Sequence, residues 1–168
     1  MSVLILPYEG VDSARLNASR EEVRKTIPSE VRAYKKGCAD ADQFLGASIH
    51  AYYDDRGHCS AFEIYAPQSV DFFGHELLGR PFREVLELLR QWADDVKMQG
   101  AGALSVKLGV SLYAPDGDEP ESLVKGVLVF RRGYWEEPIN PRLKAKFDQI
   151  QKSLEERLGR KKLADSDE

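Results

Sequence analysis

The sequence predicts an α+β fold in which two tandem helix and β-hairpin repeats form one antiparallel sheet, with the helices on one face. Three observations lead to this prediction. Residues 45–67 alternate apolar and polar side chains on both sides of a turn, which is typical of a half-buried β-hairpin. Apolar residues recur at helical spacing from Phe82 to Trp92. The same order of elements also occurs twice, with a period of about 60 residues.

The first repeat, about residues 10–67, follows a predicted strand at Val3–Leu6. Ser19 and Glu22 are spaced to cap each other's backbone amides, so a short helix is expected to begin there. Pro28 ends this helix, because proline has no amide proton for the next turn. A strand is then predicted at Val31–Lys36.

A polar loop containing Cys38 and Asp40 is expected to precede the hairpin. The hairpin turn lies at Asp54–Gly57, where Asp bonds its own backbone and Gly accepts a positive φ. Its predicted core-facing side chains are Ile49, Ala51, Tyr53, Phe62 and Ile64.

The second repeat, about residues 78–133, follows a segment at 67–79 whose apolar residues indicate a loop held against the core. Pro81 is expected at the start of the main amphipathic helix. Strands are predicted at 104–108, 110–112 and 123–131. The last of these is apolar on both sides, which favours a central place in the sheet.

A C-terminal helix is predicted over residues 141–158, with Leu143, Phe147, Ile150, Leu154 and Leu158 on one narrow stripe. Residues 161–168 are expected to form a disordered charged tail. We therefore predict a single domain over 1–160. The apolar stripe is suited to docking on this domain or on a second copy, so the chain is expected to be a monomer or a homodimer through this helix.

Composition limits the classes of protein. The 28 acidic and 24 basic residues give a net charge of −4, which is too mild to indicate a nucleic-acid partner. The beginning of the sequence has no basic segment followed by an apolar stretch, so neither a signal peptide nor a membrane span is predicted. Cys38 and Cys59 do not form a disulfide framework. These features predict a cytoplasmic protein.

No catalytic or metal-binding motif is present in the sequence. His50, His58 and His75 have no partner at the spacing of a metal site, and no glycine-rich loop is placed to hold phosphate. We therefore predict no enzyme activity, no metal and no cofactor. The alternative is a small-ligand-binding or enzymatic domain with a pocket near His50 and Glu63, because these residues lie across the predicted hairpin.

Two surfaces are candidates for partner binding. The hairpin directs polar and aromatic side chains away from the core, and tyrosine and arginine are frequent anchors of protein interfaces. The acidic loop and the segment after the last strand form a second rim that suits a basic partner. The candidate residues are His50, Tyr52, Glu63, Tyr65, Tyr113, Asp116, Asp118, Glu119, Arg131, Tyr134, Trp135 and Glu136.

Several segments together resemble a family of uncharacterised bacterial proteins. They are EGVDSARLNASREEV, IHAYYDDRGHCSAFEI, LLGRPFREVLELL, LGVSLYAPDG and VKGVLVFRRGYW, which cover most of residues 5–135. At the level of fold the duplication is also similar to the β-lactamase inhibitor protein and to a small outer-membrane assembly lipoprotein. The chain departs from both because it lacks their secretion signals and paired cysteines. The lack of a signal peptide, the mild negative charge, the lack of a catalytic motif and the aromatic sheet face together predict a protein-binding inhibitor, specifically an immunity protein that occludes a toxin domain. A basic toxin domain suits the mild negative charge.

Overall fold

The computed structural model describes residues 2–116, 119, 121–136, 149–150 and 152–159. The chain divides into two units, Met1–Trp135 and Glu136–Glu168, at a boundary inside the range predicted as one domain. In the second unit, residues 149–150 and 152–159 are helical. They belong to the helix predicted over 141–158, whose first part, like the predicted tail, lies outside the described residues.

Within its described residues, the first unit contains two helices and thirteen short strands, and a 3₁₀ turn begins at its end. The helices are α1 (Arg20–Thr26) and α2 (Phe82–Trp92), and the 3₁₀ turn is η1 (Tyr134–Glu136). The strands are β1 (Val3–Leu6), β2 (Gly10–Val11), β3 (Ala14–Arg15), β4 (Val31–Lys36), β5 (Ala39–Phe44), β6 (Ile49–Tyr53), β7 (Cys59–Tyr65), β8 (Val70–Phe72), β9 (His75–Glu76), β10 (Lys97–Gln99), β11 (Gly102–Ser105), β12 (Val110–Tyr113) and β13 (Gly126–Phe130).

The strands form two sheets. The large sheet has eight antiparallel strands in the order β10-β11-β12-β13-β7-β6-β5-β4, and the small sheet has the order β3-β2-β1-β8-β9. In the small sheet, β1 and β8 pair in parallel. Strand β13 lies between β12 and β7, which confirms its predicted central place in the large sheet.

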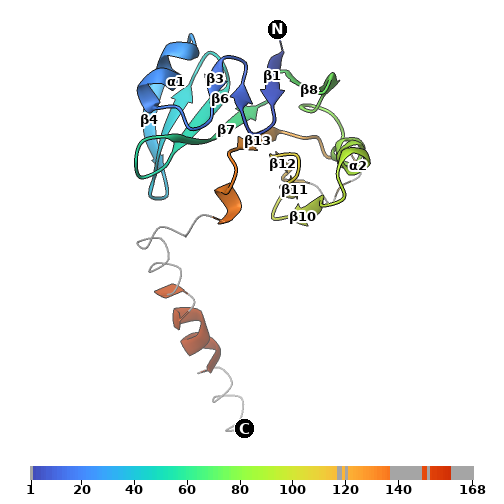
Figure 1. Cartoon of the computed structure of the whole chain (residues 1–168). Coiled ribbons are helices and arrows are strands. Elements are labelled where there is room, and N and C mark those ends of the chain that lie inside the picture. The colour runs from blue at the N-terminus through green and yellow to red at the C-terminus, as the bar shows by residue number, and fades with distance from the viewer. Residues whose placement is uncertain (1, 117–118, 120, 137–148, 151, 160–168) are drawn as a thin grey trace, which may run out of the picture. The chain divides into compact units, whose positions relative to one another are not determined.

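Each helix is followed by four consecutive strands of the large sheet. Strands β4 to β7 follow α1, and strands β10 to β13 follow α2. The two runs join where β7 pairs with β13, with Phe62 opposite Val129. The predicted helix and β-hairpin in each half therefore account for only part of each run, because four strands follow each helix. Figure 1 shows α1 and α2 toward opposite ends of the large sheet.

The main core lies on one side of the large sheet and also includes the small sheet. Val23 of α1 and Val85 of α2 are buried in it, together with Ile5 of β1 and Phe72 of β8. The prediction of one antiparallel sheet with the helices on one face is therefore corrected, because the strands form two sheets and the small sheet shares the core with the few helices. The small sheet fills part of the layer because neither helix is long enough to cover eight strands.

Local sequence explains most of the first half. Ser19 and Glu22 form the predicted capping box at the start of α1. The predicted polar loop around Cys38 and Asp40 is wrong from residue 39 onward, because Ala39–Phe44 forms strand β5. The polar residues of this segment had indicated a loop. Asp42 is in fact fully buried, and it is tolerated because basic side chains surround it.

Candidate functional site

The alternation of β6 and β7 gives the large sheet two different faces. Ile49, Ala51, Phe62 and Ile64 are buried in the main core, as predicted. The intervening side chains point to the other side, which we call the outer face. It carries His50, Tyr52, Glu63 and Tyr65, and the adjacent strands add Tyr34 from β4 and Tyr113 from β12.

Five of these side chains form a connected group, which we call the tyrosine cluster. The Tyr52 hydroxyl donates to Glu63 Oε2 at 2.5 Å, and the Tyr34 hydroxyl shares a 2.5 Å hydrogen bond with His50 Nδ1. The His50 ring meets the Tyr65 ring nearly at right angles, with centroids 5.0 Å apart. Sequence reasoning found all of these residues except Tyr34, which alternation along β4 places beside them.

Burial sets the protonation of the tyrosine cluster. It raises the pKa of Tyr52, and the neighbouring Glu63 carboxylate raises it further. The pKa of Tyr65 is raised by the same two causes in the same order. Burial also lowers the pKa of His50, and the charge of Glu63 offsets this only in part. At neutral pH the cluster therefore presents neutral hydroxyls and a neutral imidazole beside Glu63.

Lys36 at the end of β4 reaches across the outer face to this carboxylate. Its Nζ lies 3.4 Å from Glu63 Oε2, 3.3 Å from the Tyr52 hydroxyl and 4.5 Å from the centroid of the Tyr52 ring. The Glu63 side chain is only 12% exposed, whereas that of Lys36 is 60% exposed. The Lys36 ammonium group therefore approaches a carboxylate that is largely shielded from solvent, while most of the Lys36 side chain stays in solvent.

A groove of about 200 Å³ lies next to this pair, and we call it the Glu63 groove. Five strands of the large sheet, β4, β7, β10, β12 and β13, and the turn η1 contribute to its lining. The lining residues are Lys36, Glu63, Gln99, Ala101, Ser111, Leu112, Tyr113, Leu128, Tyr134 and Trp135. Tyr113 is 43% exposed and Trp135 is 42% exposed, so two aromatic side chains at the groove are accessible to another molecule.

Part of the outer face is covered by the chain itself. Phe130 is buried there, with the Tyr134 ring stacked on it at 5.6 Å and the Tyr8 ring edge-on at 6.0 Å. Tyr134 and Tyr8 belong to this second apolar cluster, as does the buried ring of Tyr52. The expectation of an entirely free face is therefore corrected, because the accessible part is the region of the tyrosine cluster and the Glu63 groove.

The other described residues of the predicted partner-binding set neither line the Glu63 groove nor belong to the tyrosine cluster. Arg131 lies beyond β13 and pairs with Asp54 at 2.8 Å, at the opposite end of β7 from Tyr65. Asp116 and Glu119 are exposed, and the Asp116 carboxylate lies 3.9 Å from Lys125. Asp118 lies outside the described residues. Glu136 ends η1 and belongs to the second unit.

A buried charged cluster on the core side was missed from the sequence. Asp42 accepts hydrogen bonds from Arg20 Nη2 at 2.6 Å, Arg24 Nη2 at 2.7 Å and the Tyr53 hydroxyl at 3.0 Å. Burial alone raises the pKa of Asp42, but these hydrogen bonds outweigh it and lower the pKa to about 2. The sequence does contain one indication of this cluster. Arg20 and Arg24 are four residues apart, and that spacing places both on one side of a helix.

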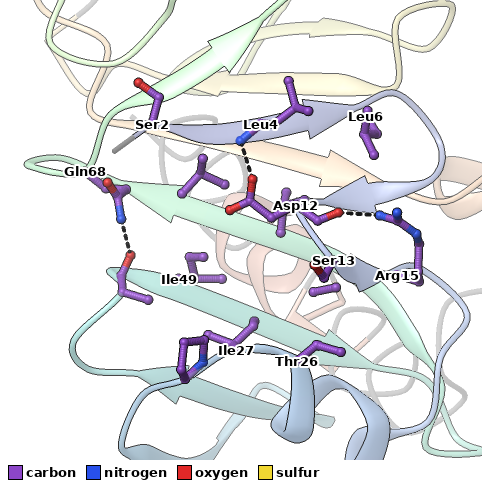
Figure 2. Close-up of a pocket in the computed structure, with 15 residues that line it drawn as sticks. Ser2, Leu4, Leu6, Asp12, Ser13, Arg15, Thr26, Ile27, Ile49 and Gln68 are labelled. Carbon is purple, nitrogen blue, oxygen red and sulfur yellow. Dashed lines mark hydrogen bonds between the residues drawn. The ribbon is translucent and has the colours of Figure 1, made fainter.

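A larger cavity of about 710 Å³ opens between the small sheet and the end of α1. Figure 2 shows Leu4 and Asp12 on the side of the small sheet, Ile27 at the end of α1, and Ile49 between them. Its polar groups are already engaged, since Asp12 Oδ1 accepts from the Leu4 amide and Gln68 donates to the Ala47 carbonyl. The cavity therefore offers mainly apolar contacts.

The described residues offer no cluster of metal-binding side chains. Within them, no group of three or more His, Cys, Asp and Glu side chains is placed to hold a metal ion. His50 does not line the Glu63 groove, so the predicted pocket near His50 and Glu63 is formed by Glu63 without the imidazole. None of the helices described is both long enough and apolar enough to cross a membrane.

No protein-family model matches the chain, and neither a curated protein nor a solved structure matches it. The class of protein is therefore defined by its own architecture. It is an α+β protein with an eight-stranded antiparallel sheet and a small second sheet, and its main core lies on one side of the large sheet. The other side carries a partly accessible cluster of tyrosines around one carboxylate.

Proposed function

We propose that this chain is a cytoplasmic bacterial binding protein that inhibits its partner by occlusion, most specifically an immunity protein that neutralises a toxin domain. The observation that carries the proposal is the accessible part of the outer face, where ordered tyrosines surround a carboxylate. The resemblance of several sequence segments to a family of bacterial proteins supports a bacterial origin for the chain. Occlusion requires a rigid surface of the right shape and needs no reacting group.

The tyrosine cluster suits this role because its side chains are already fixed. Binding usually costs conformational entropy when flexible side chains become ordered at an interface. Here Tyr52 and Tyr34 are held by hydrogen bonds to Glu63 and His50, so that part of the cost is met during folding. Tyr113 and Trp135 add exposed aromatic area, which is typical of interface anchors.

We further propose that the two halves of the sheet are copies of one ancestral unit. Each half has a helix followed by four antiparallel strands. Gly46 lies in the turn between the second and third strands of the first run, and Gly109 lies in the turn at the same place in the second. Such a unit leaves an unpaired last strand, and pairing β7 with β13 satisfies both copies.

The partner surface is tested by co-expressing the chain with the product of the neighbouring gene and measuring complex formation by calorimetry. Tyr113→Ala combined with Trp135→Ala is expected to weaken the complex by at least about 10-fold, as loss of interface anchors does. Phe73→Ala is the matched control, because Phe73 is 59% exposed and lies after β8 in the small sheet. Equal binding by the double variant and the control would remove this surface from the proposal.

A second candidate function is small-ligand binding, and the cavity in Figure 2 favours it. Its volume of about 710 Å³ falls within the range of sites for small organic molecules. Native mass spectrometry of the purified protein is the direct test, because a bound ligand adds a discrete mass. Ser13→Trp fills the mouth from an exposed position and is expected to remove that mass. A single unliganded mass in the unmodified protein counts against this function.

The C-terminal helix is the proposed route to a homodimer. Ile150, Leu154 and Leu158 are 57%, 52% and 60% exposed, so the described part of the stripe has apolar area to bury. Light scattering on the full chain and on a chain ending at Pro141 tests this. A dimer that persists without the helix, or a monomer at all concentrations with it, contradicts the proposal.

A further inference from the structure

Lys36 occupies a position in which a cation is bound by the chain's own anion and aromatic ring. We propose that the Glu63 groove is a recognition site for a basic side chain of the partner, preferably arginine, and that Lys36 fills its cation position until the partner displaces it. This inference rests on the proposed function and deepens it, because it specifies the chemistry of the partner. The proposal depends on no contact within the main core or within the small sheet.

The acceptor at this site is well sheltered. Glu63 is 12% exposed and stands between the Tyr52 hydroxyl and the Lys36 ammonium group. A carboxylate in so little water strongly favours a cation beside it, because its own hydration is incomplete. The groove next to it leaves room for a further group. A cation entering the groove therefore meets an anion that is already oriented.

Aromatic side chains supply the second half of the site. The Tyr52 ring lies under the Lys36 ammonium, with Nζ 4.5 Å from the ring centroid, which is within the range of a cation–π interaction. Tyr113 and Trp135 line the same groove and remain more than one-third exposed. A carboxylate with aromatic walls is the combination that recognises a cationic side chain, whereas a neutral or acidic side chain gains little from it.

Lys36 is a weak occupant of this position. Its Nζ contacts are 3.3 and 3.4 Å long, and 60% of its side chain is exposed. Contacts of this length are weak, and most of the lysine side chain is already in solvent, so the lysine loses little when another cation takes its place. A partner cation then replaces it charge for charge, and Glu63 is never left alone. Arginine is the preferred replacement, because its planar group bonds carboxylates at two points and stacks on rings.

The surrounding charge also favours a basic partner. Asp116 and Glu119 are exposed in the loop that follows β12, the strand that carries Tyr113. Acidic groups at the rim of an interface speed the approach of a cationic partner without fixing its final position. The roles of the two regions are therefore distinct, since the rim attracts basic molecules generally and the groove selects one side chain.

The test uses the full chain and the peptide acetyl-Gly-Arg-Gly-amide as probe, with the Trp135 indole resonance followed by NMR. Trp135→Phe identifies that resonance, because Trp92 is the second tryptophan. Saturable shifts are expected for the arginine peptide and not for its citrulline counterpart. Lys36→Met removes the internal competitor and is expected to tighten binding roughly 5-fold, the scale of an exposed ion pair. Glu63→Gln is expected to abolish the shifts.

Lys35→Met is the matched control, because Lys35 is the neighbour of Lys36 in β4, points to the opposite face and pairs with Asp40. Equal tightening by the two lysine variants would show a general charge effect and overturn the proposal. Equal binding of the citrulline peptide would also overturn it. Thermal unfolding of Glu63→Gln confirms that the variant is folded. Loss of this site alone leaves the proposed function standing if the partner still binds through Tyr113 and Trp135.

Discussion

Tyr52 and Glu63 are diagonal neighbours on the antiparallel strands β6 and β7, and their side chains share a hydrogen bond of 2.5 Å. Glu63 stands directly opposite His50, so the tyrosine ring must lean along the sheet to reach the carboxylate. Aromatic side chains are long enough to span such a diagonal. The bond therefore fixes the buried phenol and the slightly exposed carboxylate on the outer face.

Tyr52→Phe is expected to lower the free energy of unfolding by about 1–2 kcal/mol, because Glu63 loses a donor while the ring still packs. Urea denaturation measures this change. Tyr113→Phe is the control, since Tyr113 is 43% exposed and its hydroxyl is accessible to water. Its free energy of unfolding should stay within about 0.5 kcal/mol of the unmodified protein. An equal loss in both variants would contradict a specific role for the Tyr52 hydroxyl.

Asp42→Asn is expected to lower the free energy of unfolding by about 3–5 kcal/mol, because Arg20 and Arg24 lose the buried carboxylate that they share. The matched change Asp40→Asn removes a carboxylate from the same strand. Asp40 pairs with Lys35 at the surface, so a change of at most about 1 kcal/mol is expected. Similar losses would mean that the buried cluster adds nothing beyond a surface pair.

Stability should fall as the pH decreases below about 6.5, in part because of His50. Burial lowers the pKa of His50 in the folded protein, so the unfolded chain binds a proton more readily and gains from acidification. The stabilising contribution of neutral His50 is complete above the pKa of the imidazole in the unfolded chain. It is lost as the pH falls through the pKa of the imidazole in the folded protein.

Urea midpoints measured at about pH 7.5 and about pH 5 test this effect of His50. His50→Gln is expected to show a smaller decrease than the unmodified protein. His58→Gln should retain the full decrease, because that side chain is exposed in the turn before β7. A decrease that is unchanged in His50→Gln would assign the pH dependence to other groups.

The two cysteines should react at very different rates. Cys59 is fully buried, and burial raises the pKa of its thiol to about 12, whereas Cys38 is half-buried in the turn before β5. Only the thiolate reacts quickly with thiol reagents. At mildly alkaline pH, a colorimetric thiol reagent is expected to modify Cys38 alone in the folded protein. Cys38→Ser should abolish the reaction until denaturant is added, and Cys59→Ser should leave it unchanged.

The sequence predicted the elements whose local pattern matches their environment. The hairpin of β6 and β7, the capped helix α1 and the central strand β13 each follow from alternation or capping within a few residues. The small sheet could not be predicted in this way. Its strands β2, β3 and β9 have two residues each, which is too short for a periodic signal.

The site was predictable only where one strand determined it. Alternation along the hairpin placed His50, Tyr52, Glu63 and Tyr65 on one face, as the structure has them. The participation of Lys36 depends on the order of four strands and on the reach of a long side chain, neither of which a linear pattern contains. Asp42 was missed for the same reason. Its burial can be explained only when the contact between α1 and β5 is known, because α1 supplies the basic side chains that bind it.

The position of β13 also affects how the protein is made. This strand comes after every other described strand in the chain, yet it completes the middle of the large sheet. While the polypeptide is still leaving the ribosome, β7 and β12 each present an unpaired edge until residues 126–130 arrive. Exposed edges of this kind promote association between chains. Nascent chains that end before Gly126 should therefore be the ones that chaperones retain.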